Sequence, residues 1–199
     1  NGIMRLAYSN NMYVAACWSG AIIHSNDGIA WQSVNTGTPE DFNTVIYAEN
    51  RFIAISEDGD VLTSNTLTNW TNHTKINSYS INGLAYGNGR YIAVETFGKA
   101  YRSSDLQTWE FTSLGFDNDL NDVVFAKDMF VAVGEGGKIF TSDSGIVWTR
   151  RTTGRTNELF GVTFINNHFA AVGKAGDILF SNDGILWTRK QTGANFEFK

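Results

Sequence analysis

Tryptophan recurs at a constant interval along this chain, and this spacing constrains the fold more than any other feature. Five of the six tryptophans stand 39 residues apart, at Trp31, Trp70, Trp109, Trp148 and Trp187. A fixed period of this length is typical of repeat architectures, in which each unit buries its apolar face against the next unit. The chain is therefore expected to contain five copies of one structural unit.

Other residue types repeat with the same offset. A serine stands six positions before each repeat tryptophan, at Ser25, Ser64, Ser103, Ser142 and Ser181. A glycine stands eleven positions before it, at Gly20, Gly59, Gly98, Gly137 and Gly176. No insertion breaks the register, so the expected units span approximately residues 1–39, 40–78, 79–117, 118–156 and 157–195 of a single domain, 1–199.

Each unit reads as four short strands. In the fourth unit the predicted strands are residues 122–126, 129–133, 138–141 and 146–150. The first turn of every unit is predicted to be a tight hairpin, at Asn10-Asn11, Glu49-Asn50, Asn88-Gly89, Lys127-Asp128 and Asn166-Asn167. Asn, Asp and Gly tolerate the positive φ that a primed hairpin turn requires.

Four antiparallel strands repeated at this interval predict an all-β protein, a five-bladed β-propeller, whose ring arrangement protects the sheet edges. An open β-solenoid is the alternative, but its repeats are usually shorter and parallel. The last residues, 196–199, fall at the repeat phase of Asn1–Met4 and place Phe198 in the apolar series that includes Ile3. We expect this tail to help close the ring.

Composition excludes several classes of function. The hydrophobic content of 42% is enough for a buried core. The net charge of −5 and the pI of about 5.1 argue against a nucleic-acid partner, which needs a cationic surface. The single cysteine, Cys17, allows no internal disulfide, and no apolar run has the length of a membrane span, so no membrane insertion is expected.

The hairpin before each repeat tryptophan, as in Ser25–Trp31 and Ser181–Trp187, resembles a shortened Asp-box, Ser-x-Asp-Gly-x-x-Trp, of bacterial-neuraminidase-repeat propellers. Together with Tyr86–Val94 it is similar to the repeats of photosystem II assembly-factor-like propellers. The resemblance implies a propeller fold. It leaves function open, because the superfamily includes sialidases, other glycosidases, lectins and assembly factors, and it favours an extracellular, cell-surface or virion-associated location.

We interpret the box residues as structural, with the serine and aspartate satisfying turn amides while the tryptophan packs between sheets. These residues are Ser25, Asp27, Trp31, Ser64, Trp70, Ser103, Asp105, Trp109, Ser142, Trp148, Ser181, Asp183 and Trp187. Thr66 and Ser144 replace the aspartate in the second and fourth units. Leu67 and Leu106 replace the glycine in the second and third units.

Binding residues are expected where the units differ, in the turn between the second and third strands, here called the variable turn. The candidate ligand-binding residues are Trp18, Glu57, Asp58, Phe97, Glu135 and Lys174. Trp18, the one tryptophan outside the repeat series, is a plausible platform for a sugar ring. The alternative is that Trp18 only covers the mouth of the propeller tunnel or a blade edge.

Catalysis has little support in the sequence. Glu57 and Glu135 occupy equivalent turns and are weak candidates for a glycosidase carboxylate pair. The chain has no Arg-Ile-Pro segment of the sialidase kind, and Cys17 has no neighbouring histidine. His24, His73 and His168 stand at different repeat phases, so no metal site is predicted, and no phosphate-binding loop or other cofactor motif occurs.

Three hypotheses follow. The first is a non-catalytic recognition module that binds a glycan or a protein surface through the loop face. The second is a scaffold or assembly factor for a protein partner. The third is a glycosidase with carboxylates from different blades. The oligomeric state is left open.

Overall fold

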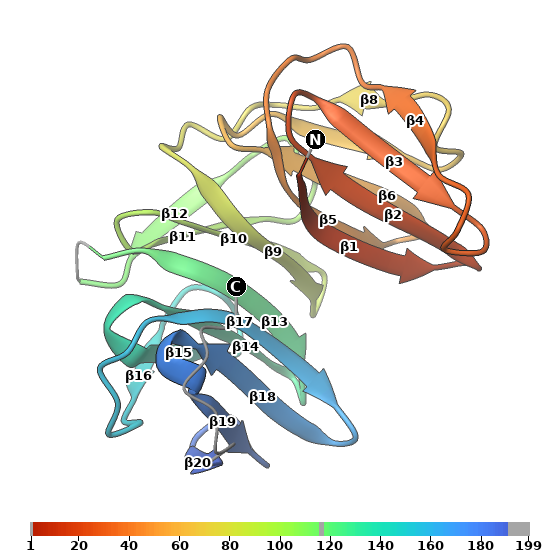
Figure 1. Cartoon of the computed structure of the whole chain (residues 1–199). Coiled ribbons are helices and arrows are strands. Elements are labelled where there is room, and N and C mark those ends of the chain that lie inside the picture. Colours follow the sequence, from red (N-terminus) through yellow and green to blue (C-terminus); the bar gives the residue numbers. More distant parts are fainter. Residues whose placement is uncertain (1, 116–117, 191–199) are drawn as a thin grey trace. The chain divides into compact units, whose positions relative to one another are not determined.

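The structure, a computed structural model, describes residues 2–115 and 118–190 (Figure 1). This part of the chain folds into five four-stranded antiparallel sheets with only two short 3-10 turns, η1 (Glu135–Gly137) and η2 (Lys174–Gly176). The prediction of an all-β chain with five four-stranded units is confirmed. The predicted closing tail, 196–199, lies outside the described residues.

Each sheet is built from four consecutive strands. The first contains β1 (Ile3–Ser9), β2 (Met12–Cys17), β3 (Ala21–Ser25) and β4 (Gln32–Asn35). The second contains β5 (Phe42–Ala48), β6 (Arg51–Ser56), β7 (Val61–Ser64) and β8 (Thr71–Asn72). The third contains β9 (Ile81–Gly87), β10 (Arg90–Glu95), β11 (Lys99–Ser103) and β12 (Glu110–Ser113). The fourth contains β13 (Leu120–Ala126), β14 (Met129–Gly134), β15 (Lys138–Ser142) and β16 (Thr149–Arg151). The fifth contains β17 (Leu159–Ile165), β18 (His168–Gly173), β19 (Ile178–Ser181) and β20 (Thr188–Lys190).

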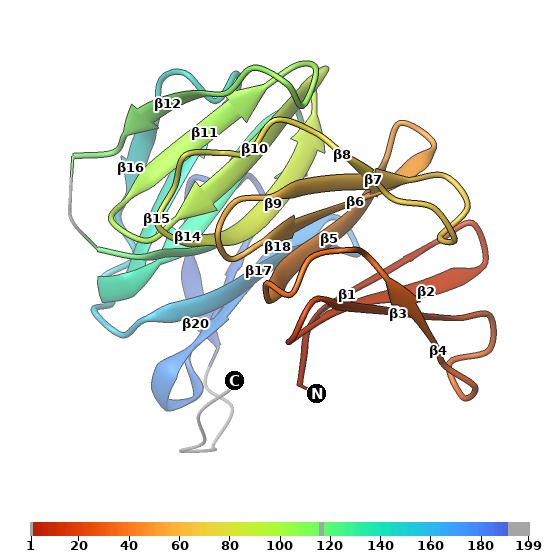
Figure 2. The same cartoon turned by 90° about the horizontal axis from the view of Figure 1, so that it is seen from above.

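The first hairpin of every sheet turns through two residues of positive φ, as predicted. In the first sheet these are Asn10 (φ 53°) and Asn11 (φ 57°), and Lys127 (φ 49°) and Asp128 (φ 58°) adopt the same conformation in the fourth. Two successive left-handed residues twist the backbone in the same sense as the flanking strands, so the hairpin closes without splaying. Figure 2 shows the resulting antiparallel hairpins, in which the strands of each sheet are neighbours in chain order.

The predicted start of the fourth strand is wrong. Residues 146–150 were expected to be extended, but β16 begins at Thr149. Ile146 donates its backbone N–H to Ser144 Oγ at 3.3 Å, and the Trp148 indole N–H donates to the Gly145 carbonyl at 3.1 Å. These bonds hold the chain in the turn up to the tryptophan, so strand pairing begins only after it.

The chain forms two compact units, one of Asn1–Leu84 with Asp105–Trp109 and one of Ala85–Ser104 with Glu110–Lys199. Within each unit the first strands of successive sheets, β1 with β5 and β13 with β17, lie side by side (Figures 1 and 2). The core of each unit lies between these sheets.

Each sheet has two apolar faces that serve different neighbours. In the fourth sheet Phe130 and Phe140 pack in a cluster with the third sheet, whereas Val131, Val133 and Ile139 pack in a cluster with the fifth. Alternating side chains on one strand point to opposite sides, which separates the two sets. We call the face toward the preceding sheet the leading face and the face toward the following sheet the trailing face.

Candidate functional site

The hairpin that precedes each repeat tryptophan is closed by its serine and aspartate. Ser25 Oγ accepts the backbone N–H of Gly28 at 2.9 Å and donates to Asp27 Oδ1 at 2.9 Å. The same Asp27 oxygen accepts the N–H groups of Ile29 (2.8 Å) and Ala30 (2.9 Å). Ser181 and Asp183 make the corresponding bonds in the fifth sheet.

These bonds change the acidity of both aspartates. Donation from the Ile29 and Ala30 amides, with Ser25, holds the pKa of Asp27 below its ordinary value. The Leu186 and Ile185 amides lower the pKa of Asp183 in the same way, against a smaller opposing effect of burial. Hydrogen bonds to the charged form favour it. One oxygen of each carboxylate is therefore engaged by turn amides.

The remaining serines of the series also lie at the base of their hairpins. Ser64 Oγ accepts the Leu67 N–H at 2.8 Å, and Ser142 Oγ accepts the Gly145 N–H at 2.8 Å. Ser103 is buried. Asp105 Oδ1 accepts the N–H groups of Gln107 and Thr108, both at 2.8 Å.

The repeat tryptophans differ in what they contact. Trp187 is 8% exposed in the core between the fourth and fifth sheets, and Trp70 and Trp148 are half-buried against their clusters. The Trp31 ring centroid lies 6.4 Å from that of Tyr13. Among the described residues, the buried indole N–H groups of Trp70 and Trp109 have no hydrogen-bond partner. In both of these hairpins leucine replaces the glycine whose carbonyl accepts the indole proton elsewhere.

Four of the five variable turns are anchored by the same backbone hydrogen bond. In four of them the first residue donates its N–H to a carbonyl of the loop or strand that precedes the sheet: Trp18 to Gly2 (3.2 Å), Glu57 to Asp41 (2.7 Å), Glu135 to Asp119 (2.9 Å) and Lys174 to Glu158 (2.8 Å). The donor and acceptor are sixteen residues apart in each case. The same backbone anchor thus holds four turns whose side chains differ.

In the compact unit that contains Asn1–Leu84, the variable turns carry an aromatic ring beside carboxylates. Trp18 is 49% exposed, and its indole lies over Gly2, where an added Cβ would fall 3.2 Å from the ring. Ser19 (φ 61°) donates its N–H to Asp41 Oδ1 at 2.6 Å, and the Asp41 carbonyl accepts from Glu57. Asp41 therefore links the turns that present Trp18 and Glu57.

The two acidic candidates of this unit differ in their contacts. The exposed Glu57 carboxylate has no hydrogen bond or ion pair with any described residue. Asp58 lies 3.8 Å from Lys75, which is also 3.5 Å from Asp60. Glu57 is thus available to a partner, whereas Asp58 is partly neutralised.

In the other compact unit the variable turns are less acidic. Phe97 is 48% exposed at a φ of 65°. Glu135 accepts a hydrogen bond from Asn118 Nδ2 at 2.7 Å, and Asn118 Oδ1 accepts one from Lys138 at 2.9 Å. Glu135 therefore belongs to a polar chain that ends at a cation.

Lys174 is exposed beside a buried ion cluster that sequence reasoning missed. Asp177, 0% exposed, accepts from Arg155 at 3.1 and 3.2 Å, from Asn157 at 2.9 Å, and pairs with Arg189 at 2.6 Å. Burial would raise the pKa of Asp177, but these donors and positive charges together hold it below its ordinary value. A sign in the sequence was available, because only Asp60 and Asp177 are acidic directly after the turn glycine.

The two weak catalytic candidates fall in different compact units, Glu57 in the first compact unit and Glu135 in the second. Their approach across a substrate stays a prediction. Cys17 is buried, and burial raises the pKa of its thiol, so the thiolate is disfavoured. No group of three or more His, Cys, Asp or Glu side chains suited to hold a metal ion occurs among the described residues.

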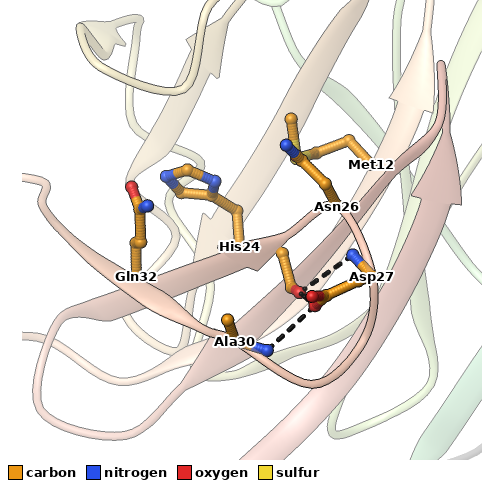
Figure 3. Close-up of a pocket in the computed structure, with 7 residues that line it drawn as sticks. Met12, His24, Asn26, Asp27, Ala30 and Gln32 are labelled. Atoms are coloured by element: carbon orange, nitrogen blue, oxygen red, sulfur yellow. Dashed lines mark hydrogen bonds between the residues drawn. The ribbon is translucent and has the colours of Figure 1, made fainter.

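A hollow of about 250 Å³ lies on the first sheet, beside the Ser25–Trp31 hairpin (Figure 3). His24 and Gln32 are cross-strand neighbours along one part of it, with Met12 and Asn26 at another. Asp27 also lines the hollow, but the turn amides occupy its Oδ1. The structure gives this hollow no feature that selects a ligand.

Over residues 2–115 and 118–190, no helix is long and apolar enough to cross a membrane. No family model matches the chain, and no curated protein matches it in sequence.

Solved structures match the chain in fold. A structure titled YCF48 bound to D1 peptide is 19% identical, with a TM-score of 0.71, over 94% of this chain and 66% of the other. YCF48 from Cyanidioschyzon merolae is 16% identical, with a TM-score of 0.69, over 93% and 68%. The computationally designed Ika8 protein is 15% identical, with a TM-score of 0.77, over 99% and 64%.

The chain thus spans about two thirds of the length of each of these structures. At such low identity the likeness carries the fold alone. Five consecutive four-stranded antiparallel sheets that match propeller structures define the architecture: the chain has a five-bladed β-propeller fold.

Proposed function

We propose that this chain is a non-catalytic propeller module that binds a protein partner through its variable turns. The observation that carries the proposal is the backbone anchor of four of these turns, whose first residue donates its N–H to a carbonyl sixteen residues earlier. Rigid turns with different side chains suit recognition, because little conformational entropy is lost on binding.

The first unit supplies the strongest anchor. Trp18 is half-exposed, and partially exposed tryptophans are enriched among residues that dominate protein interfaces. Asp41 links the turn of Trp18 to the turn of Glu57, whose carboxylate is exposed. An aromatic ring beside carboxylates fits a partner segment that pairs an apolar side chain with lysine or arginine.

A structural neighbour supports a peptide as the kind of partner. YCF48, which shares the fold, has been solved bound to a D1 peptide. The sequence resemblance to assembly-factor-like propellers points in the same direction. The partner of this chain is proposed from its own turn residues, because low identity transfers no binding residue.

A glycan is the second candidate ligand, and the half-exposed Trp18 is the observation in its favour. Trp18 offers an apolar face, and Glu57 in the linked turn offers a hydrogen-bond acceptor, both of which sugars use. A glycosidase would need Glu57 and Glu135 across one bond.

The test is selection of binding peptides from a displayed random library on the immobilised chain, followed by calorimetric titration of the selected peptides. We expect Trp18→Ala to weaken binding at least tenfold, about 1.4 kcal/mol or more. Glu57→Gln should weaken it less and reduce its salt dependence. Ile29→Ala, which truncates an 85% exposed side chain at a hairpin tip, is the matched control and should have no effect.

Peptides that bind Trp18→Ala and the natural chain equally would contradict the proposal. A glycan array run with the same proteins separates the second candidate. A sugar signal that disappears in Trp18→Ala, without any peptide enrichment, would favour the lectin.

A further inference from the structure

A buried carboxylate in the fifth sheet brings two arginines together. Asp177 Oδ1 accepts from Arg155 Nη2 at 3.1 Å and pairs with Arg189 Nε at 2.6 Å, so the two guanidinium groups lie beside the same oxygen. Asp177 Oδ2 accepts from Arg155 Nε at 3.2 Å and from Asn157 Nδ2 at 2.9 Å. These four side chains come from the fifth sheet and the loop before it, within one compact unit.

The cluster carries more positive charge than Asp177 neutralises. Two guanidinium groups share this one carboxylate, and Lys174 adds a third cation. The Lys174 carbonyl accepts the Asp177 N–H at 3.3 Å, whereas its side chain is exposed. Glu158, the acidic residue of the preceding loop, accepts a hydrogen bond from Asn121 of the fourth sheet at 3.1 Å. The two arginines, Lys174 and Asp177 together leave an excess of two positive charges.

This excess stands out against an acidic chain. Residues 149–190 contain six Lys or Arg and three Asp or Glu, whereas residues 1–148 contain eight and sixteen. The positions of Arg155 hold Thr38 and Asn77 in the first two copies. An anionic ligand is therefore attracted to the fifth copy more than to the earlier ones.

Both arginines keep N–H donors that no described residue uses. A guanidinium has five N–H groups in a fixed fork. Arg155 contacts Asp177 through Nε and Nη2, and Arg189 contacts it through Nε. Their Nη1 groups make no hydrogen bond with any residue of 2–115 or 118–190. The two side chains are 32% and 35% exposed, so these donors are accessible from solvent.

We propose that this cluster binds a dianionic phosphate group through Arg155, Arg189 and Lys174. The charge of a phosphate group is about −1.5 to −2 at pH 7, which matches the local excess. Its three terminal oxygens accept more hydrogen bonds than the two of a carboxylate, and guanidinium forks pair with them side by side. Asp177 is a positioning residue, because it holds both guanidinium groups in place before the ligand arrives and so lowers the entropic cost of binding.

Two sources present this group, a free phosphate compound and a phosphorylated side chain of another protein. The phosphate site does not depend on the proposed function, since Trp18 belongs to the other compact unit. Trp18→Ala should therefore leave phosphate binding unchanged, and each proposal can fail without the other.

The test is titration of the full chain, labelled with ¹⁵N, with inorganic phosphate at constant ionic strength. We expect saturable shifts of the Arg155 and Arg189 Nε–Hε signals. Sodium acetate, the carboxylate comparison, should bind at least about threefold more weakly, because it carries less charge and fewer acceptors. Shifts that do not saturate would overturn the proposal, and so would equal affinity for acetate.

Variants assign the binding to the cluster. Lys174→Gln, at an exposed position, should weaken phosphate binding about threefold. Arg189→Lys keeps a cation beside Asp177 but removes the fork, so a loss of about tenfold is expected. Arg150→Gln is the matched control, because Arg150 is exposed at the repeat position of Arg189 in β16. A loss in Arg150→Gln as large as that in Lys174→Gln would contradict the assignment. Circular dichroism melting confirms that each variant is folded.

Peptides separate the two sources. A pool of random peptides with a central phosphoserine is compared with the same pool carrying serine. Phosphoserine peptides that bind more tightly than inorganic phosphate, and lose this binding in Lys174→Gln, identify a phosphorylated protein as the source. Peptides that bind no more tightly than inorganic phosphate identify a free phosphate compound.

Discussion

Gly145 illustrates how a single position sets the spacing between two sheets. It has a φ of 76°, and a Cβ added there would collide with the Ile92 side chain, which is fully buried in the third sheet. Leu67 and Leu106 occupy the same repeat position at φ of 67° and 63°, where their side chains are buried. The glycine is therefore required by its neighbour and not by the turn alone.

We expect Gly145→Ala to lower the free energy of unfolding by about 2–4 kcal/mol, from overpacking and left-handed strain together. Gly154→Ala is the control, because Gly154 has a φ of 66° with nothing within 4 Å of the added Cβ. It should cost about 1–2 kcal/mol, the strain alone. If chemical denaturation gives the same loss of unfolding free energy for both variants, the Ile92 side chain moves aside at no cost in free energy.

At the scale of elements, the Asp177 cluster joins the end of η2, just before β19, and the strand β20 to the loop that contains Arg155 and Asn157. The folded pKa of Asp177 lies below that of the unfolded chain, so the unfolded state binds more protons at acid pH. The contribution of Asp177 is therefore complete above the ordinary aspartate pKa of 3.8 and is lost as the pH falls through the folded value.

We expect Asp177→Asn to lower the free energy of unfolding by about 1–3 kcal/mol at neutral pH, since it weakens charged hydrogen bonds at a buried site. The difference from the natural chain should shrink as the pH falls below about 4, near the ordinary aspartate pKa. Asp58→Asn, at an exposed carboxylate near Lys75, should change little. A difference that stays constant down to the acid transition would contradict this account. Urea titrations at several pH values provide the measurement.

Much of the element pattern follows from the 39-residue period, because hairpin turns and alternating apolar residues recur at every copy. The start of β16 did not follow, since it depends on an indole N–H bond from Trp148 to Gly145 that propensity does not encode. The Asp177 cluster was missed for a different reason. Arg155 and Arg189 reach it from other elements, and no charged residue stands at the repeat positions of Arg155 in the other copies. Features unique to one copy leave no periodic signal.

At the scale of the whole molecule, the protection of backbone amides from hydrogen exchange should depend on the position of the strand within its sheet. Second strands such as β14 are buried along most of their length, whereas the fourth strands β16 and β20 are largely exposed. Amides protected by core packing exchange only when the whole cooperative unit around them unfolds. Hydrogen exchange should therefore be slowest at Val131–Val133 and their repeat equivalents and fastest in the fourth strands. Equal protection across the four strands of a sheet would contradict this expectation.

The repeated packing between the trailing face of one sheet and the leading face of the next also bears on how such genes change length. Each internal interface uses the same pairs of positions, as Val14 with Val45 and Val131 with Val162 illustrate. Unequal recombination that adds or removes one whole repeat would therefore preserve the fit of the surfaces it brings together. Copy number can change in a single genetic step, whereas an insertion of one residue within a strand would reverse the side-chain alternation beyond it and expose the core.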